Sequence, residues 1–239
     1  MLTGKEKAAF LKERRTNLKD LYIHSSYWIN PASSNKETLS ISKMLLKKEI
    51  RLAQSLEVGY LVLHAGSAKG YKPTKDDPDG KLQGILTLAK MLNSILKKES
   101  GIEILLENSA HGKKSIGNDL HDFAILQQEL DYPEKVGFCL DTAHAFSYGY
   151  DLTALDEFVS LVDKTLGLNK VKLIHFNDSQ DAHGSMQDRH AFPGHGTMGK
   201  KILQPFLHHP QLASIPKIIE GPEWDVQKTM DALEDIWSW

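Results

Sequence analysis

The sequence predicts an α/β fold in which parallel strands alternate with helices around a barrel. Short apolar runs recur along the chain, helical patterns separate them, and a histidine or a carboxylate closes each run. The runs are almost continuously apolar, as are parallel strands that are buried on both faces. Repeated units of this kind form either an open doubly wound sheet or a (β/α) barrel, and both folds bind ligands at the carboxyl ends of their strands.

Six apolar runs are predicted to be strands, and the helical patterns lie before and between them. The strands are expected at residues 21–27, 59–67, 102–109, 136–144, 171–178 and 216–222. The helices are expected at residues 5–20, 34–55, 82–98, 119–130, 153–166, 198–208 and 225–237. A barrel is favoured because ionisable side chains close every run, whereas an open sheet concentrates its chemistry at one switch point. No GxGxxG or GxxxxGK[ST] pattern directly follows a run, which disfavours a nucleotide-binding fold.

The barrel is expected to be incomplete, with six parallel strands in one domain spanning residues 1–239. A closed barrel of this type has eight strands, but only about twenty residues precede the first run, and residues 5–20 look helical. About two βα units are therefore expected to be missing at the N-terminus. Unpaired edge strands invite association, so we expect the 5–20 helix or self-association with a partner chain to cover the open side.

Composition excludes several classes of protein. With 41% hydrophobic and 25% charged residues the chain is a folded protein, and no run approaches the roughly 20 apolar residues that cross a bilayer. We expect a cytoplasmic protein with no membrane contact, nucleoid-associated if its source is bacterial. The single cysteine, Cys139, precludes an internal disulfide and is expected in the core. A net charge of -2 provides no general attraction for nucleic acid, so a nucleic-acid partner requires local contacts or metal ions.

Nine imidazole and carboxylate groups are expected to meet at one rim of the barrel. One histidine at a strand end is more often a hydrogen-bonded structural residue than a ligand. Nine such groups without partners would each cost on the order of several kcal/mol, a cost that bound metal ions would offset. Mixed nitrogen and oxygen ligands suit Zn²⁺, with Mn²⁺ or Fe²⁺ as substitutes. The nine are His24, His64, Glu107, Asp141, His144, His175, Asp188, His190 and Glu220. The histidines assigned no metal are His111, His121, His183, His195, His208 and His209.

At these residues the chain resembles the endonuclease IV family of apurinic/apyrimidinic (AP) endonucleases. The resemblance covers about residues 20–222, in family order. It rests on HSSYWIN (24–30), LHAGS (63–67), LLENSAHG (105–112), CLDTAHAFSYGYDL (139–152), IHFNDSQDAHGSMQDRHAFPGHGTMG (174–199) and IIEGP (218–222). It implies a TIM barrel of the endonuclease IV and xylose isomerase-like type, three zinc ions per chain, and a role in base excision repair.

The resemblance also implies a ligand set for each zinc and a reaction. One zinc would be held by His24, His64 and Glu107, and a second by Glu107, Asp141, His175 and Glu220. The third would be held by His144, Asp188 and His190. A hydroxide between the first two metals would hydrolyse the phosphodiester bond 5′ to an abasic site in double-stranded DNA. The products would be a 3′-hydroxyl and a 5′-deoxyribose phosphate. Glu107 and Glu220 are the catalytic candidates because they could orient this nucleophile.

Recognition of DNA is expected to involve aromatic and polar side chains near the rim. The resemblance assigns Tyr27 and Trp28 to the gap that a flipped abasic nucleotide leaves in the base stack. The alternative is that both rings simply pack over the barrel mouth. Arg189 is the leading candidate for a phosphate contact, with Ser185 and Lys69 as further candidates. His195 stands where the family usually has a glutamate, so the surroundings of the third zinc are expected to differ there.

Two other functions remain open on the sequence. The family's first two βα units have no counterpart here, so the chain could be a catalytically weak or inactive metal-binding module that binds damaged DNA. Sugar isomerases share the barrel and use similar ligands, so a sugar isomerase-like metal enzyme is the second alternative. Three ligand sets rather than two disfavour an isomerase, and a count of metals per chain distinguishes the isomerase from the nuclease.

Overall fold

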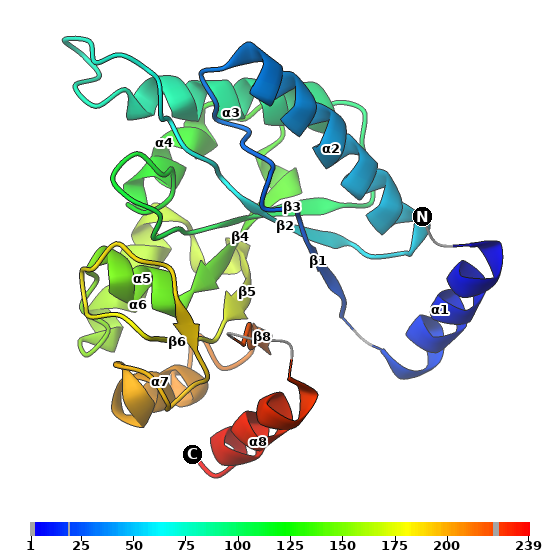
Figure 1. The fold of residues 1–239 in the computed structure, drawn as a ribbon, viewed down its shortest axis with the longest axis vertical. Helices are drawn as coiled ribbons and strands as arrows, with labels where there is room; N and C mark the ends of the chain where they lie inside the picture. The colour runs from blue at the N-terminus through cyan, green and yellow to red at the C-terminus, as the bar shows by residue number, and fades with distance from the viewer. Residues whose placement is uncertain (1–2, 19, 222–224) are drawn as a thin grey trace.

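The computed structural model describes residues 3–18, 20–221 and 225–239. Lys19, in the predicted N-terminal helix, and Pro222, at the end of the last predicted run, lie outside this range. The described residues form an open, curled sheet of six parallel strands with helices alternating along the chain (Figure 1). The predicted α/β half-barrel of six parallel strands is therefore confirmed.

The main sheet has the strand order β1-β2-β3-β4-β5-β8, and every neighbouring pair is parallel. Its strands are β1 (Tyr22–His24), β2 (Tyr60–His64), β3 (Glu103–Glu107), β4 (Val136–Asp141), β5 (Val171–His175) and β8 (Lys217–Ile218). A separate antiparallel pair consists of β6 (Asp178–Ser179) and β7 (His190–Ala191), and the apolar pattern did not predict it.

The helices follow the predicted alternation, with one addition. They are α1 (Gly4–Asn17), α2 (Lys36–Ser55), α3 (Lys81–Leu96), α4 (His121–Gln128), α5 (Thr142–Tyr148), α6 (Leu155–Thr165), α7 (Gly199–His208) and α8 (Val226–Trp237), with 3₁₀ turns η1 (Pro133–Lys135) and η2 (Leu168–Lys170). Over the part of the chain that is described, no helix has the length and apolar character that a membrane crossing requires.

Helix α5 corrects the prediction that residues 136–144 form one extended run. Strand β4 ends at Asp141, and α5 begins at the next residue. The Asp141 side chain accepts a hydrogen bond from the backbone N–H of His144 at 2.7 Å, which caps the helix. The chain turns at Asp141 because this carboxylate satisfies a free amide of the first helical turn.

The two faces of the main sheet bury different sets of side chains. The outer face packs against the helices in one large apolar cluster that includes Leu46, Leu92, Phe123 and Phe138. The inner face forms a small cluster of Val62, Leu105, Cys139 and Leu173, each at most 1% exposed. Cys139 therefore lies in a core, as predicted, and burial raises the pKa of its thiol to about 12.

A pair of tyrosines closes this inner face from β1 and β2. The rings of Tyr22 and Tyr60 stack with their centroids 5.1 Å apart. The Tyr22 hydroxyl donates to the Lys172 carbonyl of β5 at 3.2 Å. The edge strand β1 thus reaches across to β5, and the sheet curls over its own interior although no described strand joins β1 to β8.

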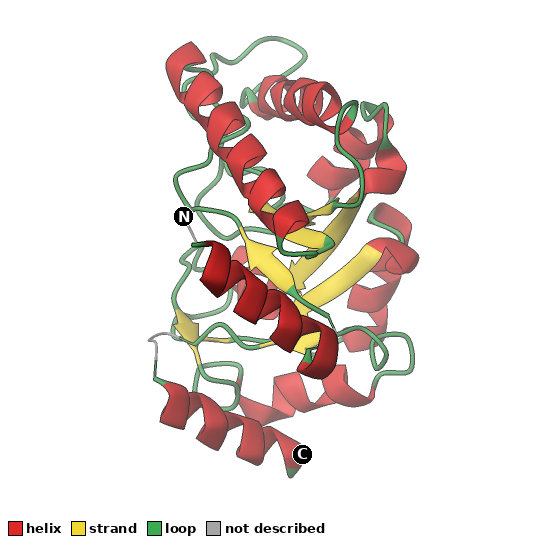
Figure 2. Ribbon diagram, turned by 90° about the vertical axis from the view of Figure 1, so that its right-hand side faces the viewer, coloured by secondary structure: helices red, strands yellow, loops and turns green. Residues whose placement is uncertain are grey.

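Helix α1 lies on the β1 side of the molecule, where the open side was expected to be covered (Figures 1 and 2). Arg14 Nε donates to the Glu57 carbonyl at 2.8 Å, and Arg15 pairs with the Glu57 carboxylate. None of the 14 residues of α1, all of them described, is buried. The predicted helix is therefore present but adds no buried residue to the core, and self-association through the sheet edges stays a prediction.

A buried carboxylate fastens β6 and β7 to the segment that leads into α7. Asp178 is 0% exposed. Its oxygens accept backbone N–H groups at 2.8–3.1 Å from Ser179, Gly194, Gly196, Met198 and Gly199. A Cβ at position 196 would lie 2.4 Å from Asp178 Oδ1, so this close approach requires glycine.

Asp178→Asn should lower the free energy of unfolding by about 1–3 kcal/mol, because an amide NH₂ would replace one acceptor oxygen and face buried N–H donors. Urea denaturation monitored by circular dichroism measures this change. The control is Asp156→Asn, since the Asp156 side chain is 91% exposed and pairs with His209 at the surface. Equal unfolding free energies for the two variants would contradict the role given to Asp178.

Candidate metal centre

The main sheet brings six of the nine predicted ligands to one edge. His24, His64, Glu107, Asp141 and His175 are the last residues of β1 to β5, and Glu220 follows β8 by two positions. The register pairs His64 with Glu107 and Asp141 with His175. Neighbouring parallel strands in register end side by side, so these groups meet at the carboxyl end of the sheet, where barrels of this type bind ligands.

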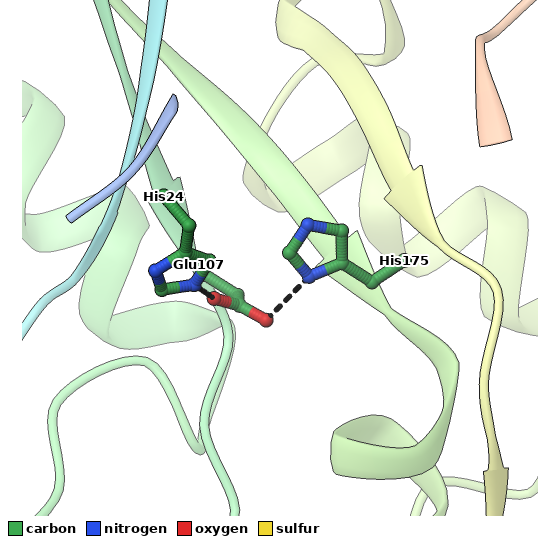
Figure 3. Close-up of side chains that lie close together, drawn as sticks. All are labelled: His24, Glu107 and His175. Carbon is green, nitrogen blue, oxygen red and sulfur yellow. Dashed lines mark hydrogen bonds and ion pairs between the residues drawn. The ribbon is translucent and has the colours of Figure 1, made fainter. Parts of the chain in front are cut away.

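Glu107 lies at the middle of this group, on β3, and is 0% exposed. Its Oε2 lies 2.9 Å from His24 Nε2 and 3.5 Å from His64 Nε2. Its Oε1 lies 2.8 Å from His175 Nδ1. The two oxygens thus face imidazoles from strands on opposite sides of β3 (Figure 3). One carboxylate is thereby shared between two groups of candidate ligands.

The group on the β4, β5 and β8 side is held together by His175. Its Nδ1 lies 2.9 Å from Glu220 Oε2 and 3.8 Å from Asp141 Oδ2. Glu107, Asp141, His175 and Glu220 each offer a ligand atom within 4.8 Å of the others, a spacing that could hold a metal ion. The four are the residues that the family resemblance implied for the second metal.

The remaining three predicted ligands meet on the α5 and β7 side. Asp188 Oδ1 lies 3.1 Å from His144 Nε2 and 3.1 Å from His190 Nε2, and the two ring nitrogens are 3.4 Å apart. Asp141 Oδ2 is 3.6 Å from His190 Nε2. Asp141, His144 and His190 also form a group that could hold a metal ion, so the candidate sites are contiguous.

The hydrogen bonds of two imidazoles indicate where a cation would fit. His24 Nδ1 lies 2.9 Å from the Ser25 carbonyl, and His144 Nδ1 lies 2.7 Å from the Asn108 carbonyl. Because a carbonyl only accepts hydrogen bonds, each Nδ1 carries a hydrogen, and Nε2 is the nitrogen left to face the carboxylate. A lone pair at Nε2 facing a carboxylate oxygen is unfavourable, so either a proton or a metal cation must lie between the two atoms. The donor set therefore fits divalent metal ions.

The charges of the centre are strongly coupled. Burial opposes ionisation of Glu107, but His175 and its other imidazole neighbours outweigh burial and hold its pKa well below the usual range. Burial also opposes charge on His144, yet Asp141 and Asp188 raise its pKa to about 10. Glu107 thus remains ionised, and the centre requires positive charge from protons or from metal ions.

Two asparagines that we did not predict connect the ligands. Asn108 Nδ2 donates to the Asp141 carbonyl at 3.0 Å, and Asn108 Oδ1 accepts from the Asp141 N–H at 2.7 Å. Asn177 Nδ2 donates to Asp141 Oδ2 at 2.6 Å, and its Oδ1 accepts from the Glu220 N–H at 2.8 Å. Each asparagine comes one or two residues after a candidate ligand that ends a strand, and this position was the available signal.

His111 also belongs to the cluster, although the sequence analysis assigned it no metal. Its Nε2 lies 2.9 Å from Asp188 Oδ2. By contrast His195, expected near the third site, lies 3.5 Å from Asp235 of α8.

The candidate DNA-binding residues differ in their exposure and in their hydrogen-bond partners. Tyr27 is 73% exposed and Trp28 is 81% exposed, in the loop after β1, so neither ring is buried over the barrel mouth. Arg189 Nε donates to Asp181 Oδ2 at 2.9 Å, so a phosphate would compete with this carboxylate. Ser185 is half-buried, and Lys69 is exposed in the loop after β2.

Comparison with known proteins agrees with this architecture. A family model described as "Xylose isomerase-like TIM barrel" matches residues 4–236. A protein of Thermosipho africanus named "Probable endonuclease 4" is 35% identical over 233 residues, which are 94% of this chain and 80% of that relative. The chain belongs to the endonuclease IV family. This endonuclease IV family member also resembles the solved structure of endonuclease IV from Thermus thermophilus. The two are 26% identical with a TM-score of 0.79, over 98% of this chain and 84% of that one.

A more distant likeness concerns the fold alone. A D-tagatose 3-epimerase-like protein superposes with a TM-score of 0.73 at 19% identity, over 99% of this chain and 84% of that one. Such a likeness carries no information about chemistry, because one barrel fold supports many activities.

Binding of Zn²⁺ to this endonuclease IV family member should release protons and should weaken as pH falls from about 8 to about 6. Although burial opposes their charge, nearby carboxylates raise the pKa of His144 and His190, so these rings hold protons that a metal must displace. Calorimetric titration in two buffers of different ionisation enthalpy measures the release. The control is His183→Ala, since His183 is exposed and contacts the Tyr150 carbonyl. Identical heats in both buffers would argue against this interpretation.

Proposed function

We propose that this chain is a metal-dependent DNA repair endonuclease. It would hydrolyse the phosphodiester bond 5′ to an abasic site in double-stranded DNA and leave a 3′-hydroxyl and a 5′-deoxyribose phosphate. The observation that carries the proposal is the position of Glu107, a buried carboxylate with one oxygen toward His24 and the other toward His175. Membership of the endonuclease IV family supports DNA as the substrate.

We propose three Zn²⁺ sites, with Mn²⁺ or Fe²⁺ as possible substitutes. The ligand sets are His24, His64 and Glu107; Glu107, Asp141, His175 and Glu220; and His144, Asp188 and His190. When bound, such ions lower the pKa of a coordinated water and neutralise charge on phosphoryl oxygens. The contacts of Glu107, Asp141 and Asp188 with imidazoles of their sets, at 2.8–3.8 Å, support this grouping.

Glu107 and Glu220 have different accessibility and hence different proposed catalytic roles. The Glu107 side chain is 0% exposed and fixes the positions of the imidazoles around it, whereas the Glu220 side chain is 31% exposed. Burial raises the pKa of Glu220, but His175 outweighs burial and lowers it, so Glu220 stays ionised near neutral pH. Glu220 can therefore accept a hydrogen bond from the attacking water and orient it. Asn177, which accepts from the Glu220 N–H, holds this carboxylate in place.

Glu107→Gln should reduce metal loading and incision by at least about 100-fold, because loss of a direct ligand costs more than the roughly 10- to 100-fold caused by loss of an outer partner. Incision is measured on duplex DNA containing a tetrahydrofuran abasic analogue, and bound metal is measured by elemental analysis. Glu103→Gln is the matched control, since Glu103 begins the strand that Glu107 ends.

The same assay separates the competing functions. Incision by metal-loaded wild-type chain supports the nuclease. Tight binding of abasic DNA without incision, with all three metals present, would replace the proposal by the inactive binding module. Two metals per chain without DNA binding would favour the sugar isomerase-like enzyme.

Trp28→Ala and Tyr27→Ala should each weaken binding to abasic duplex about 5- to 150-fold, since stacking of a base on an aromatic ring contributes about 1–3 kcal/mol. Both rings are exposed beside the centre, and we propose that they enter the gap in the base stack, with Arg189 and Ser185 contacting phosphates. Fluorescence anisotropy measures binding. The control is Trp237→Ala on α8, where the ring is 79% exposed. Equal affinities of the Trp28 and Trp237 variants for abasic duplex would exclude the proposed insertion of Trp28 into the base stack.

A further inference from the structure

His111 is an imidazole of the cluster that stands outside the three proposed ligand sets. It lies in the loop after β3, four residues beyond Glu107. Its Nε2 lies 2.9 Å from Asp188 Oδ2. The other oxygen of Asp188, Oδ1, lies 3.1 Å from both His144 Nε2 and His190 Nε2. The two oxygens of one carboxylate are thus divided between the third ligand set and His111.

The direction of this hydrogen bond follows from its partners. An ionised carboxylate only accepts, and, unlike in His24 and His144, no carbonyl among the described residues holds the hydrogen of His111 on Nδ1, so His111 Nε2 carries the hydrogen and donates it to Asp188. Asp188 has the ring nitrogens of three histidines at 2.9–3.1 Å from its oxygens, and these surroundings favour the carboxylate as an acceptor. His111 thus acts as a donor here and presents no lone pair at Nε2.

Ring contacts fix the orientation of the His111 imidazole. Its centroid lies 5.9 Å from the His64 ring, 6.2 Å from the His144 ring and 5.9 Å from the Tyr27 ring. The His111 side chain is 35% exposed, so part of it reaches solvent while three rings lie around it. A donor in this position can fix the orientation of the Asp188 carboxylate.

Asp188 needs such a partner because neither a helix nor a strand holds it. It lies between β6 and β7, two residues before His190. Its side-chain partners within the described residues are three histidines, and two of them are proposed metal ligands. Without His111, only His144 and His190, the other proposed ligands of the same metal, would restrain rotation of the Asp188 carboxylate.

We propose that His111 is a positioning residue for the third metal site. It donates from Nε2 to Oδ2 of Asp188 and so keeps Oδ1 aimed between His144 and His190. The inference rests on the proposed metal-dependent function and adds to it a residue outside the three ligand sets. Loss of an outer partner of this kind reduces metal affinity about 10- to 100-fold, and the loss should fall on one of the three metals.

The test compares wild type, His111→Ala and His111→Gln after loading with Zn²⁺. Each protein is titrated with a chelator, and the zinc retained per chain is counted by elemental analysis. Wild type should retain three ions. His111→Ala should lose one of them to a chelator whose affinity for zinc is about 10- to 100-fold lower. His111→Gln should restore retention, since its side-chain amide can donate to the same oxygen. His121→Ala is the matched control, because His121 pairs with Asp119 at 2.8 Å on the exposed surface.

The outcomes separate this inference from the proposed function. Wild type that binds no zinc would overturn both. If wild type binds three ions and His111→Ala releases them as wild type does, the role of His111 is overturned. The proposed function is left standing. Failure of His111→Gln to restore retention would overturn the hydrogen-bond assignment. Urea unfolding of the metal-free proteins completes the test: a large loss of stability in His111→Ala, with all three ions released together, would show a structural role and overturn the inference.

Discussion

The carboxylate of Glu107 is the group on which the rest of the centre depends. A buried carboxylate is strongly unfavourable unless opposite charge or hydrogen-bond donors surround it. Here the compensation comes from His24, His64 and His175, which reach Glu107 from both sides along the sheet. This arrangement is possible because β3 lies inside the sheet, with β2 and β4 paired to it in parallel. The strand order therefore fixes which imidazoles can share one carboxylate.

The loops beyond the strand ends are as constrained as the strands. Asp141 ends β4, caps α5 and accepts from Asn177, so one carboxylate serves the sheet, a helix and the candidate metal centre. Asn108 exchanges two hydrogen bonds with the Asp141 backbone. Thr142, the first residue of α5, donates to the Asn177 carbonyl at 2.6 Å and so fastens the start of this helix to the segment after β5. A buried network of this kind rigidifies the site only when every member is satisfied, since a lost partner leaves a costly unpaired group.

The sequence predicted the parts of the molecule that depend on apolar periodicity, and it missed those that depend on the path of a loop. The six strands of the main sheet were predictable because each lies in an apolar run, and six of the nine candidate ligands because they close those runs. Strands β6 and β7 have two residues each, too few for a pattern of alternation. Helix α5 was hidden because it has only seven residues and begins inside the predicted run, at Thr142, directly after the strand. His111 reaches the site through loop geometry, which no spacing in the sequence specifies, whereas Asn108 and Asn177 follow a strand-ending ligand by one or two positions.

The segment from Glu107 to His111 touches all three proposed ligand sets. Glu107 contacts members of the first two sets, the Asn108 carbonyl orients His144 of the third, and His111 holds Asp188 of the same set. Tyr27, on the exposed loop after β1, lies edge-on to His111. A displacement of this short segment would disturb all three proposed sets at once, whereas loss of the His111 side chain alone should affect the third set. The same contacts connect the aromatic side chain proposed to enter DNA, through His111, with the carboxylate of the third proposed set.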